Sequence, residues 1–210
     1  MIDENGPGEE VPPVTAELVE DVTLRMPRRR DWTWADLQEI PDDGHRYEII
    51  DGSLHVSPSP SRPHQIAASR LVQLLLAASP EDVEVVETID VAFGRHSLEP
   101  DVVVLEADAA YTTGGPLPPG QTLLVAEVVS PSSRRMDRLV KPSVLAEGGV
   151  RAYWRVELEG PDAPLVVVYA LEGDVYREVA TVRSGETAEV DVPFPVEIRP
   201  ADLVGPRRRR

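Results

Sequence analysis

The chain contains three residues whose types and order point most directly to chemistry. They are two acidic residues beside apolar stretches and a single lysine. Asp101 follows Pro100, Glu127 lies within an almost entirely apolar run, and Lys141 comes shortly after it. Every other residue among the 21 basic ones is an arginine, so the lone lysine is a candidate for a role that needs a compact ammonium group. Two carboxylates with an ammonium nearby are what metal-assisted hydrolysis of a phosphodiester requires.

The two carboxylates are expected at the same end of a β-sheet. Asp101 comes directly before the apolar run 102–105, and Glu127 lies near the end of the run 122–129. Such runs are typical of strands that are buried on both faces. If the two strands are neighbours, the carboxylates could hold Mg²⁺, or Mn²⁺ as a substitute, together with the carbonyl oxygen of Val128. The metal would activate a water molecule for attack and neutralise charge on the phosphate.

A helix is predicted to follow the second run. Ser130-Pro131 favours a helix start, and Gly148-Gly149 favours a helix end. The first N–H groups of this helix would face an anion near the metal. Substrate phosphate is predicted to bind three arginines of the helix, namely Arg134, Arg135 and Arg138. Lys141 lies further along the helix and is predicted to stabilise charge in the transition state.

The remaining pattern predicts an α/β fold in which a central mixed β-sheet is flanked by helices. Asp51-Gly52 is a strong hairpin signal, and apolar residues at helical spacing predict a helix over 64–78. The other predicted elements are a short helix over 33–40, hairpin strands over 46–50 and 53–57, and strands over 83–93, 152–158, 164–171 and 175–182. We expect residues 1–30 to be a disordered tail, 31–200 to be the folded domain and 201–210 to be a basic tail.

Charge and composition restrict the partners of the protein. The formal net charge is −16, whereas proteins that bind nucleic acid passively are normally basic. Contact with DNA is therefore expected to be local, and a homodimer would suit cleavage of both strands. No apolar run approaches the roughly 18 to 20 residues of a membrane span. The acidic start without a signal peptide and the absence of cysteine predict a cytoplasmic protein with no membrane partner.

Several short motifs occur in an order that resembles a known family. The motifs are Arg46-Tyr-Glu48-Ile-Ile-Asp-Gly52, Pro58-Ser-Pro-Ser61 with His64, Pro100-Asp101, Glu127-Val-Val-Ser-Pro-Ser-Ser133, Asp137-Arg138 with Lys141, and Gly149-Val150 before Tyr153-Trp154. Together they resemble the Uma-type restriction-endonuclease family of the PD-(D/E)XK nuclease superfamily, over most of the chain between residues 32 and 180.

The resemblance implies a restriction-endonuclease-like core that cuts DNA. It implies Mg²⁺ at Asp101 and Glu127, with Glu48 as a supporting acid. In the plain motif of the superfamily, the lysine stands two residues after the second acid, where this chain has Val129. The family resembled here carries the lysine on the next helix, which corresponds to Lys141.

Two residues depart from the pattern of that family. Pro142 directly follows Lys141, and proline disfavours helical geometry at the preceding residue and breaks a helix interior. We therefore expect an interruption of the helix at this point. Leu145 stands where an aromatic residue is commoner in the family.

Each candidate residue also has an ordinary structural interpretation. Asp101 could cap a turn, and Lys141 could form a surface ion pair with Asp137. Glu48 could be an exposed strand residue, and the three arginines could form a solvated helix face. His64 is assigned to substrate binding, with a helix start, a core hydrogen bond or a catalytic base as the alternatives.

The sequence thus predicts a metal-dependent endonuclease that hydrolyses phosphodiester bonds of DNA by means of metal-activated water. The alternative is a catalytically inactive domain of the same fold whose acidic surface binds basic proteins. A third hypothesis is a metal-dependent hydrolase of a small phosphorylated molecule.

Overall fold

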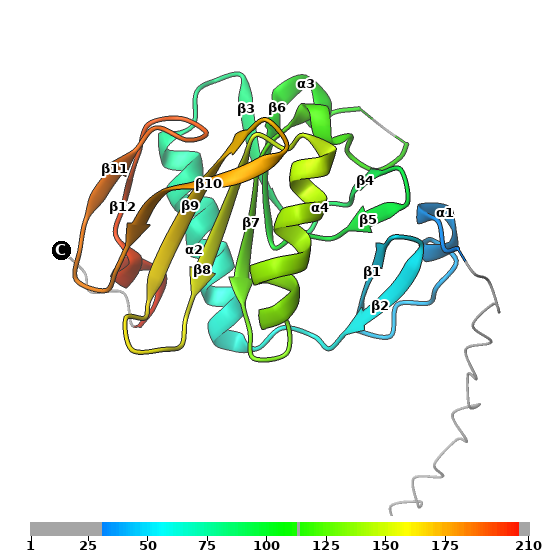
Figure 1. Ribbon diagram of the computed structural model, residues 1–210, viewed down its shortest axis with the longest axis horizontal. Helices are drawn as coiled ribbons and strands as arrows, with labels where there is room; N and C mark the ends of the chain where they lie inside the picture. The colour runs from blue at the N-terminus through cyan, green and yellow to red at the C-terminus, as the bar shows by residue number, and fades with distance from the viewer. Residues whose placement is uncertain (1–30, 113, 206–210) are drawn as a thin grey trace, which may run out of the picture.

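The computed structural model describes residues 31–112 and 114–205, which form a mixed α/β fold (Figure 1). The larger sheet contains six strands, β3 (Val83–Glu87), β6 (Val102–Glu106), β7 (Thr122–Val129), β8 (Ala152–Glu157), β9 (Leu165–Glu172) and β10 (Val175–Val182). The smaller sheet contains β1 (Arg46–Ile50), β2 (Ser53–Ser57), β4 (Val91–Phe93) and β5 (His96–Leu98). The α-helices are α1 (Trp34–Leu37), α2 (Arg62–Ala78), α3 (Ala107–Ala110) and α4 (Lys141–Gly148). A third sheet pairs β11 (Ala188–Val190) with β12 (Val196–Ile198).

The six-stranded sheet has the order β10-β9-β8-β7-β6-β3 and is covered on both faces (Figure 1). Successive side chains of a strand point to opposite faces. On β6, Val102 and Val104 accordingly pack in the cluster that contains α2, whereas Val103 and Leu105 pack in the cluster that contains α4. The apolar runs that the sequence shows on β6 and β7 therefore belong to strands buried on both sides, as predicted.

The pairing of β6 with β7 brings the two predicted metal ligands together. These strands are antiparallel, and Val102 at the start of β6 lies opposite Ala126 near the end of β7. Asp101 therefore lies beside Glu127 and Val128. Strand β7 pairs in parallel with β8, and the chain between them forms the helix that carries Lys141.

Pro142 does not interrupt this helix, so the predicted break is wrong. Met136–Val140 forms a π-helical segment that leads directly into α4. Lys141 has helical backbone angles, with φ −57° and ψ −43°. The change from π to α pairing places Pro142 in the first turn of α4, where a missing N–H is tolerated.

Two other predicted boundaries are also wrong. The run 83–93 consists of β3 and β4, which belong to different sheets, because the chain turns at Thr88 with a left-handed φ of 50°. The helix after β7 begins at Arg134 rather than at Ser130. A turn precedes it, in which the backbone N–H of Ser133 donates to Ser130 Oγ over 3.1 Å.

The described fold continues past the domain boundary predicted at residue 200. A 3₁₀ helix, Pro200–Leu203, buries Leu203 in the core beside α2, and Arg70 of α2 donates to the carbonyl of Gly205 over 2.8 Å. The predicted disordered tail 1–30 and the last residues, 206–210, lie outside the described residues. Within residues 31–112 and 114–205, no helix is both long and apolar enough to cross a membrane.

Candidate active site

A cavity of about 460 Å³ opens where β1, the start of β6, the end of β7 and α4 meet. Two serine- and proline-containing loops, 57–61 and 130–133, contribute to its walls. The cavity brings together six residues that the sequence singles out, namely Glu48, His64, Asp101, Glu127, Val128 and Lys141. Five segments, namely β1, α2, the start of β6, the end of β7 and α4, thus bring these residues to one site.

Asp101 is held by three donors from different parts of the chain. Arg46 Nη1 lies 2.7 Å from Oδ1, while His64 Nε2 lies 3.1 Å from Oδ2. The backbone N–H of Val128 also donates to Oδ2, over 2.8 Å. Burial by itself raises the pKa of Asp101, but the hydrogen bonds and charges of His64 and Arg46 outweigh it and hold the pKa well below its usual value. Asp101 is therefore a carboxylate at neutral pH.

Lys141 lies among three buried carboxylates. Its Nζ is 2.8 Å from Glu127 Oε1, 2.9 Å from Glu48 Oε1 and 3.7 Å from Asp137 Oδ1. The Lys141 residue is only 3% exposed, so the alternative of a surface ion pair with Asp137 does not describe it. Tyr153 supports this segment, because its hydroxyl donates to the carbonyl of Asp137 over 2.6 Å.

The electrostatics of this cluster fix the charge of the lysine. Burial alone lowers the pKa of Lys141, but the charges of Glu127, Glu48 and Asp137 outweigh burial and raise the pKa well above its usual value. Burial also raises the pKa of Glu127, against the opposing effect of Lys141. Lys141 is therefore a permanent cation. The negative charges of Asp101, Asp137 and Glu48 add to the effect of burial and raise the pKa of Glu127 further.

The charge balance of the site is compatible with a divalent cation. Its carboxylates are Glu48, Asp101, Glu127 and Asp137, and its permanent cations are Arg46 and Lys141. Counted as ionised groups, and with His64 left out of the count, the four carboxylates exceed the two cations by two charges. In the described part of the chain, no group of three or more His, Cys, Asp or Glu side chains is already arranged as a set of metal ligands. The carboxylates are turned toward the two basic side chains instead.

The three arginines predicted to bind phosphate lie elsewhere. Arg138 forms two hydrogen bonds of 2.8 Å with the carboxylate of Glu157, and Arg134 lies 3.5 Å from Glu159. Arg135 is exposed, and none of the three contributes to the lining of the described cavity. Their role in substrate binding remains a prediction that the geometry does not favour.

Sequence reasoning did not assign a role to Arg46 or recognise Asp137 as part of the site. Arg46 and Glu48 are two residues apart on β1, so their side chains share a face of the strand. Because Glu48 is a candidate site residue, this spacing indicates that Arg46 faces the same site. Asp137 precedes Lys141 by one helical turn and was interpreted only as a surface partner.

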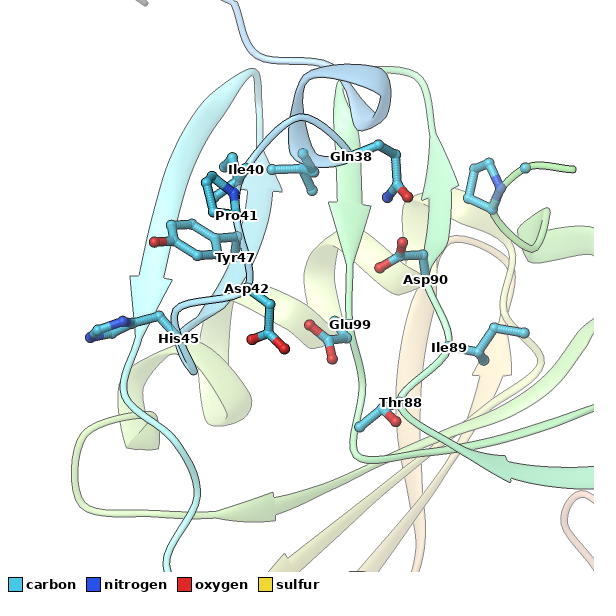
Figure 2. A pocket seen from close by; sticks show the side chains of 13 residues that line it. Gln38, Ile40, Pro41, Asp42, His45, Tyr47, Thr88, Ile89, Asp90 and Glu99 are labelled. Atoms are coloured by element: carbon cyan, nitrogen blue, oxygen red, sulfur yellow. The ribbon is translucent and has the colours of Figure 1, made fainter. Parts of the chain in front are cut away.

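A second cavity, of about 450 Å³, is lined by a different set of residues (Figure 2). Tyr47 lines it, because this residue alternates on β1 with the two that face the first cavity. The carboxylates of Asp42, Asp90 and Glu99 point into it (Figure 2). Trp34 Nε1 donates to Asp90 over 2.8 Å, and burial raises the pKa of both Asp90 and Glu99.

Comparison with known proteins gives two matches. A family model described as "Uma2: Putative restriction endonuclease" matches residues 34–203. Among solved structures, the chain is similar to a putative nuclease belonging to DUF820 from Anabaena variabilis ATCC 29413, with a TM-score of 0.62 and 20% sequence identity. That match covers 82% of this chain and 97% of the other, and at this identity it shows a common fold. No curated protein matches the chain.

Proposed function

The chain belongs to the Uma2 family of putative restriction endonucleases, and from this premise we propose that it is a metal-dependent endonuclease that hydrolyses phosphodiester bonds of DNA. The observation that carries the proposal is the buried ion cluster in the first cavity. Glu127 and Lys141 lie 2.8 Å apart at the end of β7, beside the ionised Asp101. Burying such a cluster is costly, and function is the simplest reason to keep it.

The residues present fit a divalent cation such as Mg²⁺ or Mn²⁺. Asp101 and Glu127 would hold it, with the carbonyl oxygen of Val128 as a third ligand. Oxygen donors and an excess of two negative charges are what such a hard cation prefers. When bound, the metal would lower the pKa of water and neutralise charge on the phosphate.

The residues of the chain itself would position the reacting groups. Lys141 stays protonated, because three carboxylates surround it. Its ammonium holds the Glu127 carboxylate in place and lies at the cavity wall, where it can stabilise the charge that develops on a phosphate oxygen. Lys141 also contacts Glu48 on β1, so this lysine connects the smaller sheet, which contains Glu48, with the larger sheet, which contains Glu127.

DNA contact would be confined to the neighbourhood of the cavity, because the chain as a whole is strongly acidic. Neutral donors suit that situation. Serine hydroxyl groups commonly contact phosphate, and the loops 57–61 and 130–133 place serines at the cavity wall. A homodimer would bring two such sites to the two strands of a duplex.

One observation favours an alternative function. All three donors to Asp101 come from the protein, so this carboxylate is satisfied by the protein alone. A catalytically inactive domain of the same fold could therefore be stable and use its acidic surface to bind basic proteins. The test below separates the two functions.

The test is nicking of supercoiled plasmid DNA at low salt with Mg²⁺ or Mn²⁺. We compare the wild type with Asp101→Asn and Glu127→Gln, which keep the shape of each side chain and remove its charge. Glu147→Gln, at an exposed position of α4, is the matched control. The proposal expects metal-dependent nicking by the wild type and the control, and none by the two site variants. Retained cutting by a folded Glu127→Gln variant, or no cutting by the folded wild type with either metal, would overturn it.

A further inference from the structure

Arg46 is the arginine that the structure places inside the first cavity. Its side chain is 16% exposed, and its Nη1 donates to Asp101 Oδ1 over 2.7 Å. A guanidinium carries five N–H donors in a planar fork, and this hydrogen bond uses one of them. The pKa of Arg46 is raised above its ordinary value by Asp101 and Glu127, despite burial, so the group is always charged.

The contact between Arg46 and Asp101 conflicts with metal binding at the same carboxylate. Oδ2 of Asp101 is engaged by His64 and by the Val128 N–H, whereas Oδ1 carries the bond to Arg46. A divalent cation at Oδ1 would lie close to the guanidinium, and two like charges at hydrogen-bonding distance repel strongly in a buried site. A metal held by Asp101 would therefore compete with Arg46 for this carboxylate.

The guanidinium has a second use when Asp101 releases it. Arg46 belongs to β1, a fixed wall of the cavity, so the freed group stays inside the site. Planar guanidinium groups match the two oxygens of a phosphate better than any other side chain does. Among the described residues that line this cavity, Arg46 is the only arginine. Arg138 lies outside the cavity and forms two hydrogen bonds with Glu157.

We propose that Arg46 binds the phosphate of the DNA strand to be cut, and that a divalent cation makes it available by displacing it from Asp101. The proposal rests on the proposed nuclease function and adds the residue that contacts the substrate. It also explains how an acidic protein acquires a basic phosphate contact only where and when the metal is bound.

The experiment measures two equilibria for the wild type, Arg46→Met and Arg46→Lys. Binding of a short DNA duplex is followed by fluorescence anisotropy, once in EDTA and once in Ca²⁺, a divalent cation that also takes oxygen ligands. Binding of Mg²⁺ alone is followed by calorimetry without DNA. Arg95→Met is the matched control, because Arg95 forms exposed ion pairs with Asp31 and Asp51 on the neighbouring turn.

We expect Arg46→Met to weaken DNA binding by about 10- to 100-fold in Ca²⁺, the range for a lost hydrogen bond to a charged group. In EDTA the loss should be small, since the wild-type guanidinium is then bound to Asp101. The same variant should bind Mg²⁺ more tightly than the wild type does. Arg46→Lys, which keeps the charge but not the fork, should lose less DNA affinity, and the control should match the wild type.

An equal loss of DNA affinity in EDTA and in Ca²⁺ would overturn the proposal, because it would indicate a general structural defect. Unchanged DNA binding in Ca²⁺, or unchanged or weaker Mg²⁺ binding, would overturn it as well. If Arg46→Met does not fold, Arg46→Lys decides, and wild-type DNA binding by that variant in Ca²⁺ refutes the role. A wild type that binds metal and DNA as expected but never cuts would contradict the nuclease function and leave the Arg46 result intact.

Discussion

Replacement of Lys141 by methionine removes one ammonium group and keeps a flexible side chain of similar length. In the wild type this ammonium lies within 2.9 Å of carboxylate oxygens on both Glu48 and Glu127, and 3.7 Å from Asp137. All three acids are buried, with exposed fractions of 4%, 1% and 1%. The substitution therefore leaves three largely buried carboxylates without their nearest cation.

The expected loss follows from this geometry. Removing one partner of a buried ion pair typically costs about 3–5 kcal/mol. For a domain of this size each kcal/mol lowers the melting temperature by about 2–4 °C, so we expect a decrease of about 6–20 °C. Protonation limits the loss at low pH, because burial raises the pKa of Glu127 and Asp137 and a protonated carboxyl costs little. The loss should therefore grow as the pH rises through those raised pKa values.

Thermal unfolding in EDTA at pH 6 and at pH 8.5 measures this loss and its pH dependence. Addition of Mg²⁺ should raise the melting temperature of Lys141→Met more than that of the wild type, because the cation supplies the missing positive charge; at 100 times Kd, the gain is about 2.7 kcal/mol. Arg177→Met is the matched control. Arg177 lies 3.6 Å from Glu172, both about two-thirds exposed, and such surface pairs contribute about 0–1 kcal/mol.

Two results would refute the reasoning. If Lys141→Met unfolds at the wild-type temperature at both pH values, the ammonium does not hold the carboxylates together. If the variant is destabilised but Mg²⁺ gives it no more stability than it gives the wild type, the excess negative charge is not available to a metal. The first result would refute the stabilising role of Lys141, and the second would refute the replacement of its charge by a bound cation.

Three further predictions address other parts of the molecule. Asp90→Asn should raise the stability at pH 7 and leave it unchanged near pH 3.5, because burial raises the pKa of Asp90, so its charged form is unfavourable only above the ordinary pKa; unfolding by urea at both pH values checks this. Pro142→Ala should leave metal-dependent nicking unchanged, since Lys141 already has helical backbone angles; a loss of nicking would show that proline holds the lysine in place. Arg138→Ala should leave the salt dependence of DNA binding unchanged, because the side chain is bound to Glu157; a decrease of the slope by about one would restore the phosphate role predicted from the sequence.

Local patterns predicted the elements around the site well. The Asp51-Gly52 hairpin, the bounds of β7 and the limit of α4 at Gly148 all follow from turn residues and apolar runs, which act over a few positions. The order of Asp101 and Glu127 on two apolar runs was also sufficient to expect both at one end of a sheet. That the two residues lie next to each other depends on the pairing of β6 with β7, which the sequence analysis could only assume.

The parts that could not be predicted depend on contacts between distant residues. Arg138 and Glu157 are 19 positions apart, so nothing in the helix sequence shows that this arginine is already occupied. Arg46 and Asp101 are 55 positions apart, and only the packing of the small sheet against the large one joins them. The π-helical segment that accommodates Pro142 is likewise set by the surrounding fold and not by helix propensity.

The buried charges bear on the choice between a nuclease and an inactive interaction domain. An acidic exterior is compatible with both, because exposed carboxylates cost little and serve solubility or protein binding. The four carboxylates of the cavity differ, since burying each one is unfavourable and replacing a buried ion cluster by apolar residues is often stabilising. A domain that needed only its surface would gain stability by losing that cluster. Its presence at one cavity, with Lys141 kept cationic by its neighbours, therefore favours a site that acts on a ligand.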